Sequence, residues 1–256
     1  MESDNLFSNI YQTKSNAPLA DKLRPKNLDE FFGQESILGN NSLLRNAILN
    51  DKVGNIIFFG PPGVGKTTLI EIISSYTRSS LIKLNAVLSS IKELRTEIAN
   101  AKERLLSSNR KTILFIDEVH RFNSVQQDAL LPSIENGTIT FIGATTENPF
   151  FAVNKALISR ARIFSLHPLN KNDLKKIIEK VIKYYSCLQD SKAIEIKEEA
   201  MNHLIKFSGG DARNLINALE LSISITKENK ENIVVIDLPI AEDSIQKKNI
   251  VYDKNG

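Results

Sequence analysis

The sequence predicts an α/β fold in which a parallel five-stranded sheet carries helices on both faces and is followed by a small all-helical domain. Two observations support this fold class. Apolar, β-branched runs alternate with stretches of helical periodicity in the first two thirds of the chain, a pattern typical of parallel sheets. After Pro168 the strand-like runs give way to apolar stripes with the spacing of helices.

The elements follow one another in a regular order. Five apolar runs predict the strands, at residues 55–59, 81–85, 112–117, 138–144 and 162–166. The stretches between them predict helices at residues 67–77, 90–106, 125–134 and 154–159. In the second domain, helices are expected at residues 173–185, 198–207 and 212–226. A short apolar run at residues 233–236 and a charged helical segment come last.

These elements divide the chain into parts. We expect a flexible tail at residues 1–17, the α/β nucleotide-binding domain at 18–167, a helical lid domain at 168–228 and a C-terminal segment at 229–256. The tail is predicted because polar residues interrupt its few apolar ones.

Composition excludes several classes of protein. The chain has 256 residues, of which 41% are hydrophobic and 25% charged, as in ordinary globular proteins. A net charge of +3 gives no electrostatic argument for nucleic-acid binding. The single cysteine, Cys187, excludes an intramolecular disulfide, and the three histidines lack metal-ligand spacing. With no secretory signal and no membrane-spanning run, a cytoplasmic location is expected.

A glycine-rich run between a predicted strand and a predicted helix is the most informative motif. In that context its backbone N–H groups and the helix N-terminus can bind a polyphosphate. Lys66 can reach the β- and γ-phosphates, and the Thr67 hydroxyl can ligate Mg²⁺. The motif is formed by Gly60, Pro61, Pro62, Gly63, Val64, Gly65, Lys66, Thr67 and Thr68.

Polar residues follow two other predicted strands. Asp117 can hold Mg²⁺ opposite Thr67, and the adjacent Glu118 can polarise a water for attack on the γ-phosphate. Thr145 and Thr146 end the next strand and can orient water or sense the γ-phosphate. Ligands of parallel sheets bind at the carboxyl ends of the strands, so these motifs are expected to meet in one crevice.

Three arginines have two interpretations each. Arg160 and Arg162 precede the last strand, where an arginine can reach a nucleotide held by a neighbouring subunit or form an ordinary surface salt bridge. The local sequence alone favours the salt bridge. Arg213 begins the third helix of the small domain, where it can reach back to the γ-phosphate or remain a solvated side chain.

Taken together, the motifs GPPGVGKT, ILFIDE, GATT, SRAR and GDAR resemble, in this order, those of the AAA+ ATPases. They are most similar to the clamp-loader and Holliday-junction-motor branch. The stretch DEVHRFNSVQQDALLPSIENGTITFIGATTENPFF narrows the resemblance to the replication-associated recombination protein A family (RarA/MgsA and the Werner-helicase-interacting ATPase). The resemblance extends from Pro18 to Gly256.

The resemblance implies ATP and Mg²⁺ as ligands and assigns roles to single residues. It places four residues near the adenine: Arg24, Pro25, Phe32 and Gly33. It makes Lys66 and Thr67 the Walker A pair, and Asp117 and Glu118 the Walker B pair. Thr146 resembles sensor 1, with Thr145 as the alternative register. Arg160 resembles a finger acting in trans, and Arg213 resembles sensor 2.

The resemblance also implies a function and partners. Members of the family are DNA-stimulated ATPases that act at stalled forks and at junctions of single-stranded and duplex DNA, in contact with single-strand-binding protein. They form homo-tetramers through a C-terminal domain, which we expect beyond the segment 229–256. A cytoplasmic, nucleoid-associated location would follow.

Contact with DNA is predicted at Lys92 and Arg95, which are three residues apart and so lie on one face of a helix. The alternative is a solvated face neutralised by Glu93 and Glu97.

Two other functions are compatible with the motifs. A nucleotide-gated binding switch with little turnover would keep the same residues. A protein-remodelling ATPase usually carries an aromatic residue in the loop after the second strand, and residues 85–90 contain none.

Overall fold

The computed structural model describes residues 17–188 and 193–245, and so leaves nearly all of the expected tail outside the described residues. The chain forms two compact units. The α/β unit is Pro25–Pro168, and the helical unit contains the described residues up to Arg24 and from Leu169 onward.

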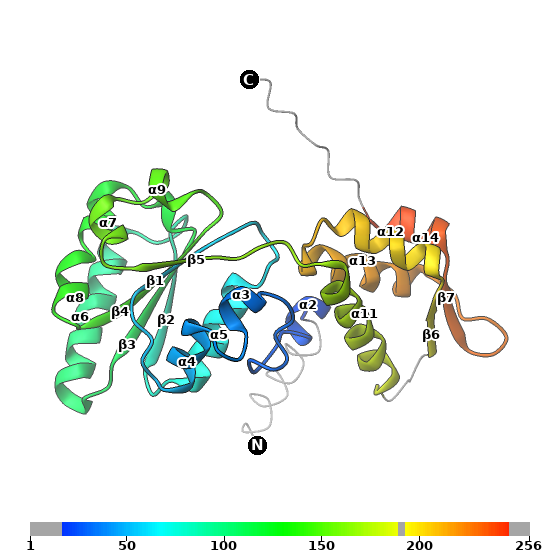
Figure 1. Cartoon of the computed structure of the whole chain (residues 1–256), viewed down its shortest axis with the longest axis horizontal. Coiled ribbons are helices and arrows are strands. Elements are labelled where there is room, and N and C mark those ends of the chain that lie inside the picture. The colour runs from blue at the N-terminus through cyan, green and yellow to red at the C-terminus, as the bar shows by residue number, and fades with distance from the viewer. Residues whose placement is uncertain (1–16, 189–192, 246–256) are drawn as a thin grey trace, which may run out of the picture. The chain divides into compact units, whose positions relative to one another are not determined.

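A five-stranded sheet forms the centre of the α/β unit, with the strand order β2-β3-β4-β1-β5 and parallel pairing throughout (Figure 1). The strands are β1 (Ile56–Phe59), β2 (Ser80–Asn85), β3 (Thr112–Asp117), β4 (Ile139–Thr145) and β5 (Arg162–Ser165). The predicted sheet is confirmed: each of the five apolar runs in this part of the chain forms a strand of it.

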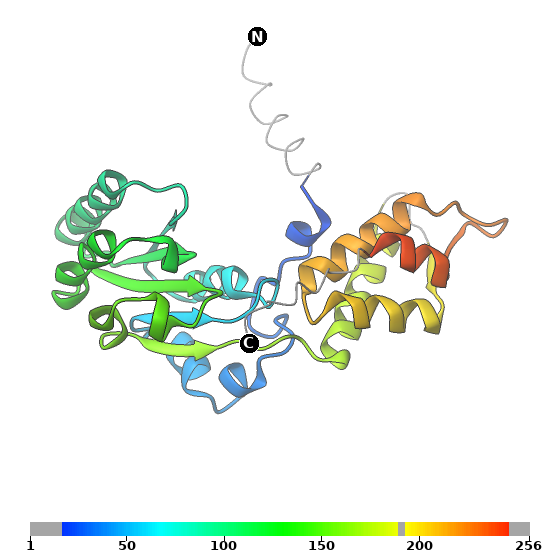
Figure 2. The same cartoon turned by 90° about the horizontal axis from the view of Figure 1, so that it is seen from above.

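Helices cover both faces of this sheet (Figures 1 and 2). They are α3 (Glu35–Leu38), α4 (Leu43–Leu49), α5 (Lys66–Tyr76), α6 (Ile91–Ser108), α7 (Ser124–Asp128), α8 (Leu131–Glu135), α9 (Pro149–Ala152) and α10 (Lys155–Ile158), with a 3₁₀ turn η1 (Val119–Arg121). Alternate strand residues point to opposite faces. Phe58 therefore packs in one core with Leu69 of α5, and Ile57 in a second core with Leu94 of α6.

The helix expected at residues 125–134 is wrong in one respect, because it is broken into α7 and α8. Pro132 lies in the first turn of α8. It has no backbone N–H, and its ring would clash with the carbonyl one turn earlier in a continuous helix. The first turn of a new helix is where proline is tolerated.

The helical unit contains α2 (Leu19–Lys22), α11 (Lys171–Ser186), α12 (Glu198–Ser208), α13 (Ala212–Ile225) and α14 (Leu238–Ser244). It is mainly helical, as expected, but it also holds a two-stranded parallel sheet of β6 (Ala193–Ile196) and β7 (Ile233–Ile236), so the expectation of an all-helical domain was incomplete. Val234 and Ile236 of β7 are fully buried, which gives the pair its apolar face.

Helix α2 groups with this unit, whereas the sequence analysis assigned residues from 18 onward to the α/β domain. Leu19 is buried, and its backbone N–H donates to the carboxylate of Glu220 on α13 at 3.3 Å. Among the described residues, none of the helices has the length and apolar character needed to cross a bilayer.

Candidate active site

The three motifs predicted to converge meet at one edge of the sheet. Phe59 at the end of β1 is in register with Thr145 at the end of β4, and the Gly60 N–H donates to the Thr145 carbonyl at 3.2 Å. On the other side of β4, β3 is paired so that Ile116 lies opposite Gly143, which brings Asp117 to the same edge. The glycine-rich loop, the two acids and the two threonines therefore surround one region at the carboxyl ends of the strands.

Two glycines of the loop lie where a side chain could not fit. A Cβ on Gly60 would lie 2.3 Å from the carbonyl oxygen of Leu166. Gly65 has a φ of +98°, and a Cβ there would lie 2.6 Å from the ring of Phe31. The loop can therefore wind closely against its neighbours only with glycine at these positions.

Lys66 is buried in the loop. Its Nζ donates to the carbonyl oxygen of Gly60 at 2.6 Å and to that of Pro61 at 2.8 Å. The ammonium is thus held at the start of α5, whose N-terminus adds its own partial positive charge. Thr67 and Thr68, in the first turn of α5, are half-buried. Such a loop can take a polyphosphate, whose oxygens would replace the two carbonyls as acceptors.

The acidic pair lies where β3 ends. The Asp117 carboxylate accepts the backbone N–H of Glu118 at 3.0 Å. Glu118 has a φ of +53°, in the left-handed region that residues other than glycine rarely adopt. Residues in this conformation are found most often at functional sites. The Thr146 hydroxyl lies 3.5 Å from Oε2 of Glu118. Thr145 is fully buried, and its hydroxyl has His120 and Glu147 as partners.

Mg²⁺ usually takes one or two protein oxygens and fills its other positions with water and phosphate oxygens. Thr67 in the first turn of α5 and Asp117 at the end of β3, two strands away from β1, offer this type of donor set. Among the described residues, no three His, Cys, Asp or Glu side chains form a group that could hold a metal ion. These residues therefore fit a Mg²⁺ site in which the protein supplies one or two ligands and a polyphosphate supplies others.

His120 is a site residue that the sequence analysis missed. Its side chain is only 3% exposed. Its Nδ1 lies 2.9 Å from Oγ1 of Thr145 and 3.4 Å from Oε2 of Glu118, and its Nε2 lies 3.4 Å from Oε1 of Glu147. The spacing of the three histidines along the chain does not fit a metal site and so does not single out His120. Its position two residues after the acidic pair is the feature of the sequence that could have indicated a place in the site.

The segment expected near the adenine lies beside the loop through Phe31, the neighbour of the predicted Phe32. Gly33 and Gln34 both have positive φ values, 79° and 60°, which turn the chain sharply. The Gln34 side chain then donates to the His167 carbonyl at 2.7 Å and accepts the His167 N–H at 2.9 Å. Pro25 and Phe32 are half-buried and Gly33 is buried.

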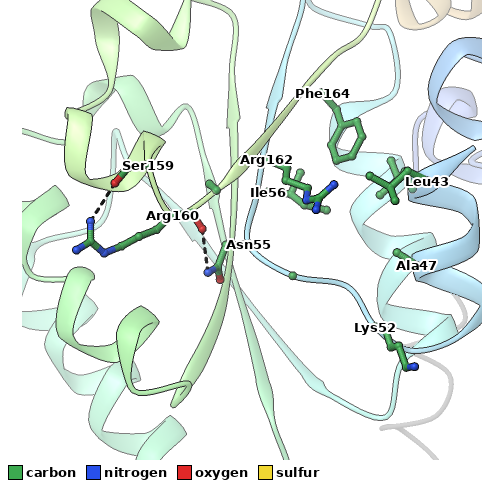
Figure 3. Close-up of a pocket in the computed structure, with 12 residues that line it drawn as sticks. Leu43, Ala47, Lys52, Asn55, Ile56, Ser159, Arg160, Arg162 and Phe164 are labelled. Carbon is green, nitrogen blue, oxygen red and sulfur yellow. Dashed lines mark hydrogen bonds between the residues drawn. The ribbon is translucent and has the colours of Figure 1, made fainter.

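Arg160 lies at the opposite edge of the sheet from the loop. It lines a pocket of about 520 Å³ together with the first residues of β1 and β5, Ile56 and Arg162 (Figure 3). Its guanidinium donates to the Glu135 carboxylate at 2.8 Å and to Oγ of Ser159 at 3.0 Å. The structure therefore shows the surface salt bridge that the local sequence favoured, and it does not bring Arg160 to the phosphate loop of its own α/β unit.

The remaining predicted residues lie elsewhere. Lys92 and Arg95 are exposed on α6, on either side of the buried Leu94. Arg24 and Arg213 belong to the helical unit. Arg24 pairs with Asp21, and Arg213 lies in the first turn of α13, whose N-cap is Asp211. The functional roles of these four residues stay predictions.

Comparison with known proteins gives consistent results. The family described as Holliday junction DNA helicase RuvB P-loop domain matches residues 23–154, and the family described as AAA C-terminal domain matches residues 190–256. Replication-associated recombination protein A of Haemophilus influenzae is 42% identical over 239 residues, which is 93% of this chain and 53% of that protein. ATPase WRNIP1 of Dictyostelium discoideum is 37% identical over 98% of this chain and 30% of its own length.

The fold has solved counterparts. The structure of the Thermotoga maritima RuvB Holliday junction branch migration motor is similar, with a TM-score of 0.65 and 27% identity over 87% of this chain and 72% of that one. The chain spans about half the length of the bacterial relative from Haemophilus influenzae, or 53%.

Proposed function

Because the chain belongs to the AAA+ ATPases with a RuvB-type P-loop domain, within the replication-associated recombination protein A family, we propose that it is a Mg²⁺-dependent, DNA-stimulated ATPase of replication-fork maintenance and recombination. The observation that supports the catalytic part is the meeting of Lys66, Asp117, Glu118 and Thr146 at one edge of the sheet.

Each residue at this edge would have one task. The loop from Gly60 to Thr68 and the ammonium of Lys66 would bind the phosphates of ATP. Thr67 and Asp117 would hold Mg²⁺, which neutralises phosphate charge when it is bound. Glu118 would orient a water in line with the γ-phosphate and polarise it, and the Thr146 hydroxyl beside Glu118 would help to position that water.

The adenine would bind next to this loop. Pro25, Phe32 and Gly33 are the proposed contacts, and the packing of the neighbouring Phe31 against Gly65 supports this position. Arg24 and Arg213, from the helical unit, are proposed to contact the adenine side and the γ-phosphate respectively. Substitution of Arg213 by Ala should then lower turnover while leaving the binding of ADP, which lacks the γ-phosphate, unchanged.

ATP turnover tests the proposal directly. The rate should rise on addition of single-stranded or forked DNA, and the Glu118→Gln variant should lose this turnover while still binding ATP. Glu103→Gln, an exposed residue of α6, is the matched control and should behave as wild type. Tight ATP binding without turnover under any condition would indicate a nucleotide-gated switch, and stimulation by unfolded protein alone would indicate a remodelling ATPase.

Lys92 and Arg95 are proposed to contact DNA phosphates from α6. Each phosphate contact releases counterions, so Lys92→Ala should weaken DNA binding and reduce the salt dependence of log K by about one unit. Lys52, at the amino edge of the sheet, supplies a control in Lys52→Ala. Equal salt dependence of all three proteins would exclude this contact.

Arg160 is proposed to act on the nucleotide of a neighbouring copy in a homo-tetramer. An arginine finger is typically worth about 10³–10⁵ in rate, so Arg160→Ala should abolish turnover without loss of ATP binding. Turnover per chain should also rise with concentration; equal rates for dilute monomer and concentrated protein would contradict this role. Contact with single-strand-binding protein and a cytoplasmic, nucleoid-associated location complete the proposal.

A further inference from the structure

We propose that His120 is a positioning residue for ATP hydrolysis, whose imidazole holds the carboxylate of Glu118 against the end of β4. This inference rests on the proposed function, because Glu118 activates water only if the site hydrolyses ATP.

The position of His120 is the first argument. It lies in the 3₁₀ turn directly after β3, and its side chain is 3% exposed while that of Glu118 is 35% exposed. A buried polar group without a partner is costly. Nδ1 lies beside the Thr145 hydroxyl and Oε2 of Glu118, and Nε2 lies 3.4 Å from Oε1 of Glu147.

The three polar contacts of the Thr145 hydroxyl can all be hydrogen bonds in one tautomer of His120, the one whose Nδ1 carries the proton. The Thr145 hydroxyl donates its one proton to the Glu147 carbonyl at 3.1 Å and accepts the Glu147 N–H at 3.0 Å. Its remaining lone pair faces Nδ1 of His120 at 2.9 Å. That contact is a hydrogen bond only if Nδ1 carries the proton. The same N–H lies 3.4 Å from Oε2 of Glu118 and so presents a donor to the carboxylate.

This arrangement restricts the Glu118 side chain. Among the described residues, the two side chains that contact its carboxylate are His120, at 3.4 Å, and Thr146, at 3.5 Å. Both distances are longer than those of ordinary hydrogen bonds. Without His120 one of these two contacts is lost, and the carboxylate can turn toward solvent. A displacement of about 1 Å at such a group can cost about 10²-fold in rate.

His120 also connects two strand ends. Glu118 follows β3, whereas Thr145 and Glu147 lie at and after the end of β4. The imidazole touches all three, so the position of the water-activating acid depends on the strand end that carries the proposed sensor.

Three substitutions separate positioning from mere packing. In His120→Asn the side-chain amide can occupy the place of Nδ1 and keep the contacts with Thr145 and Glu118. In His120→Gln the longer amide reaches the place of Nε2 and keeps the contact with Glu147. His120→Ala removes all of them.

The test measures single-turnover hydrolysis, MgATP affinity by calorimetry and the unfolding temperature of each variant. We expect His120→Ala to lower the hydrolysis rate by about 10²-fold with an ATP affinity within about twofold of wild type. His120→Asn should recover at least about tenfold of this loss and His120→Gln should not. If His120→Ala does not fold, the comparison of His120→Asn with His120→Gln tests the same inference.

Two results would overturn the inference. The first is that Glu118→Gln abolishes turnover and His120→Ala leaves it unchanged. This result would refute the role of His120 but not the proposed ATPase function. The second is equal rates for the Asn and Gln variants, with losses that follow their unfolding temperatures. A wild-type chain that binds ATP without hydrolysing it would overturn the ATPase proposal and this inference together.

Discussion

The ammonium nitrogen of Lys66 lies 2.6 Å from the carbonyl oxygen of Gly60, so the lysine closes the phosphate-binding loop on its own backbone. The side chain is buried, and a buried ammonium is stable only with acceptors around it. The carbonyl oxygens of Gly60 and Pro61 are two such acceptors. They hold the ammonium within the glycine-rich loop, at the start of α5.

Substitution of Lys66 by Ala is expected to weaken ATP binding by about 10- to 100-fold, since a hydrogen bond to a charged group contributes about 1.5–3 kcal/mol. Calorimetric titration with MgATP measures this. Lys83→Ala, which removes an exposed lysine of β2 that pairs with Glu71, is the control and should bind ATP as wild type does. Equal affinities of the Lys66→Ala and control variants would contradict the assignment.

Substitution of Gly65 by Ala should destabilise the α/β unit by about 1–3 kcal/mol and weaken ATP binding, because the new methyl group meets the Phe31 ring and the backbone is left-handed. Gly54→Ala is the matched control. Its Cβ would meet nothing within 4 Å, and its stability should stay within about 0.5 kcal/mol of wild type. Chemical denaturation of both variants measures the difference, and similar midpoints would refute the close contact.

Substitution of Gln34 by Ala should lower the free energy of unfolding by about 1–3 kcal/mol, because the backbone N–H and carbonyl of His167 lose their partner. Gln34→Glu keeps the acceptor but turns the donor into an oxygen that faces the His167 carbonyl, and it should destabilise as well. Urea unfolding measures both variants. An unchanged midpoint for Gln34→Ala would show that the amide pair contributes nothing.

Burial, with smaller contributions from the charge of Glu220 and from Tyr184, raises the pKa of Tyr185 above its usual value of 10.0. The folded chain thus favours the neutral phenol. The stabilisation is fully present below pH 10.0 and falls above it, because the unfolded chain releases the proton first. Tyr185→Phe should remove this part of the alkaline loss of stability. Identical pH profiles of stability for wild type and Tyr185→Phe would refute the shift.

The sheet and the phosphate loop could be predicted from the sequence because local patterns determine them. Each strand contains an apolar run, Asp117 and Thr146 come at or just after the ends of two of them, and the loop that holds Lys66 follows a third. In a parallel sheet those ends meet at one edge, so spacing along the chain was enough to predict the meeting of the motifs.

Other features of the fold and the site depend on contacts between residues that are far apart in the sequence. Strands β6 and β7 have four residues each and pair across an intervening stretch that contains two helices, so neither was assigned alone. Phe31 and Phe32 are adjacent aromatics, and the local sequence does not say that Phe31 is the one beside Gly65. His120 acquires its role only where β4 brings Thr145 beside it, 25 residues away in sequence.

The central claim is that one edge of the sheet both binds ATP and activates a water through Glu118. The most direct test measures, on the same samples, calorimetric binding of MgATP and single-turnover hydrolysis for wild type and for Glu118→Gln. We predict that both proteins bind ATP with similar affinity and that only wild type hydrolyses it. Absence of adenine-nucleotide binding to wild type, or equal hydrolysis by the two proteins, would contradict the claim.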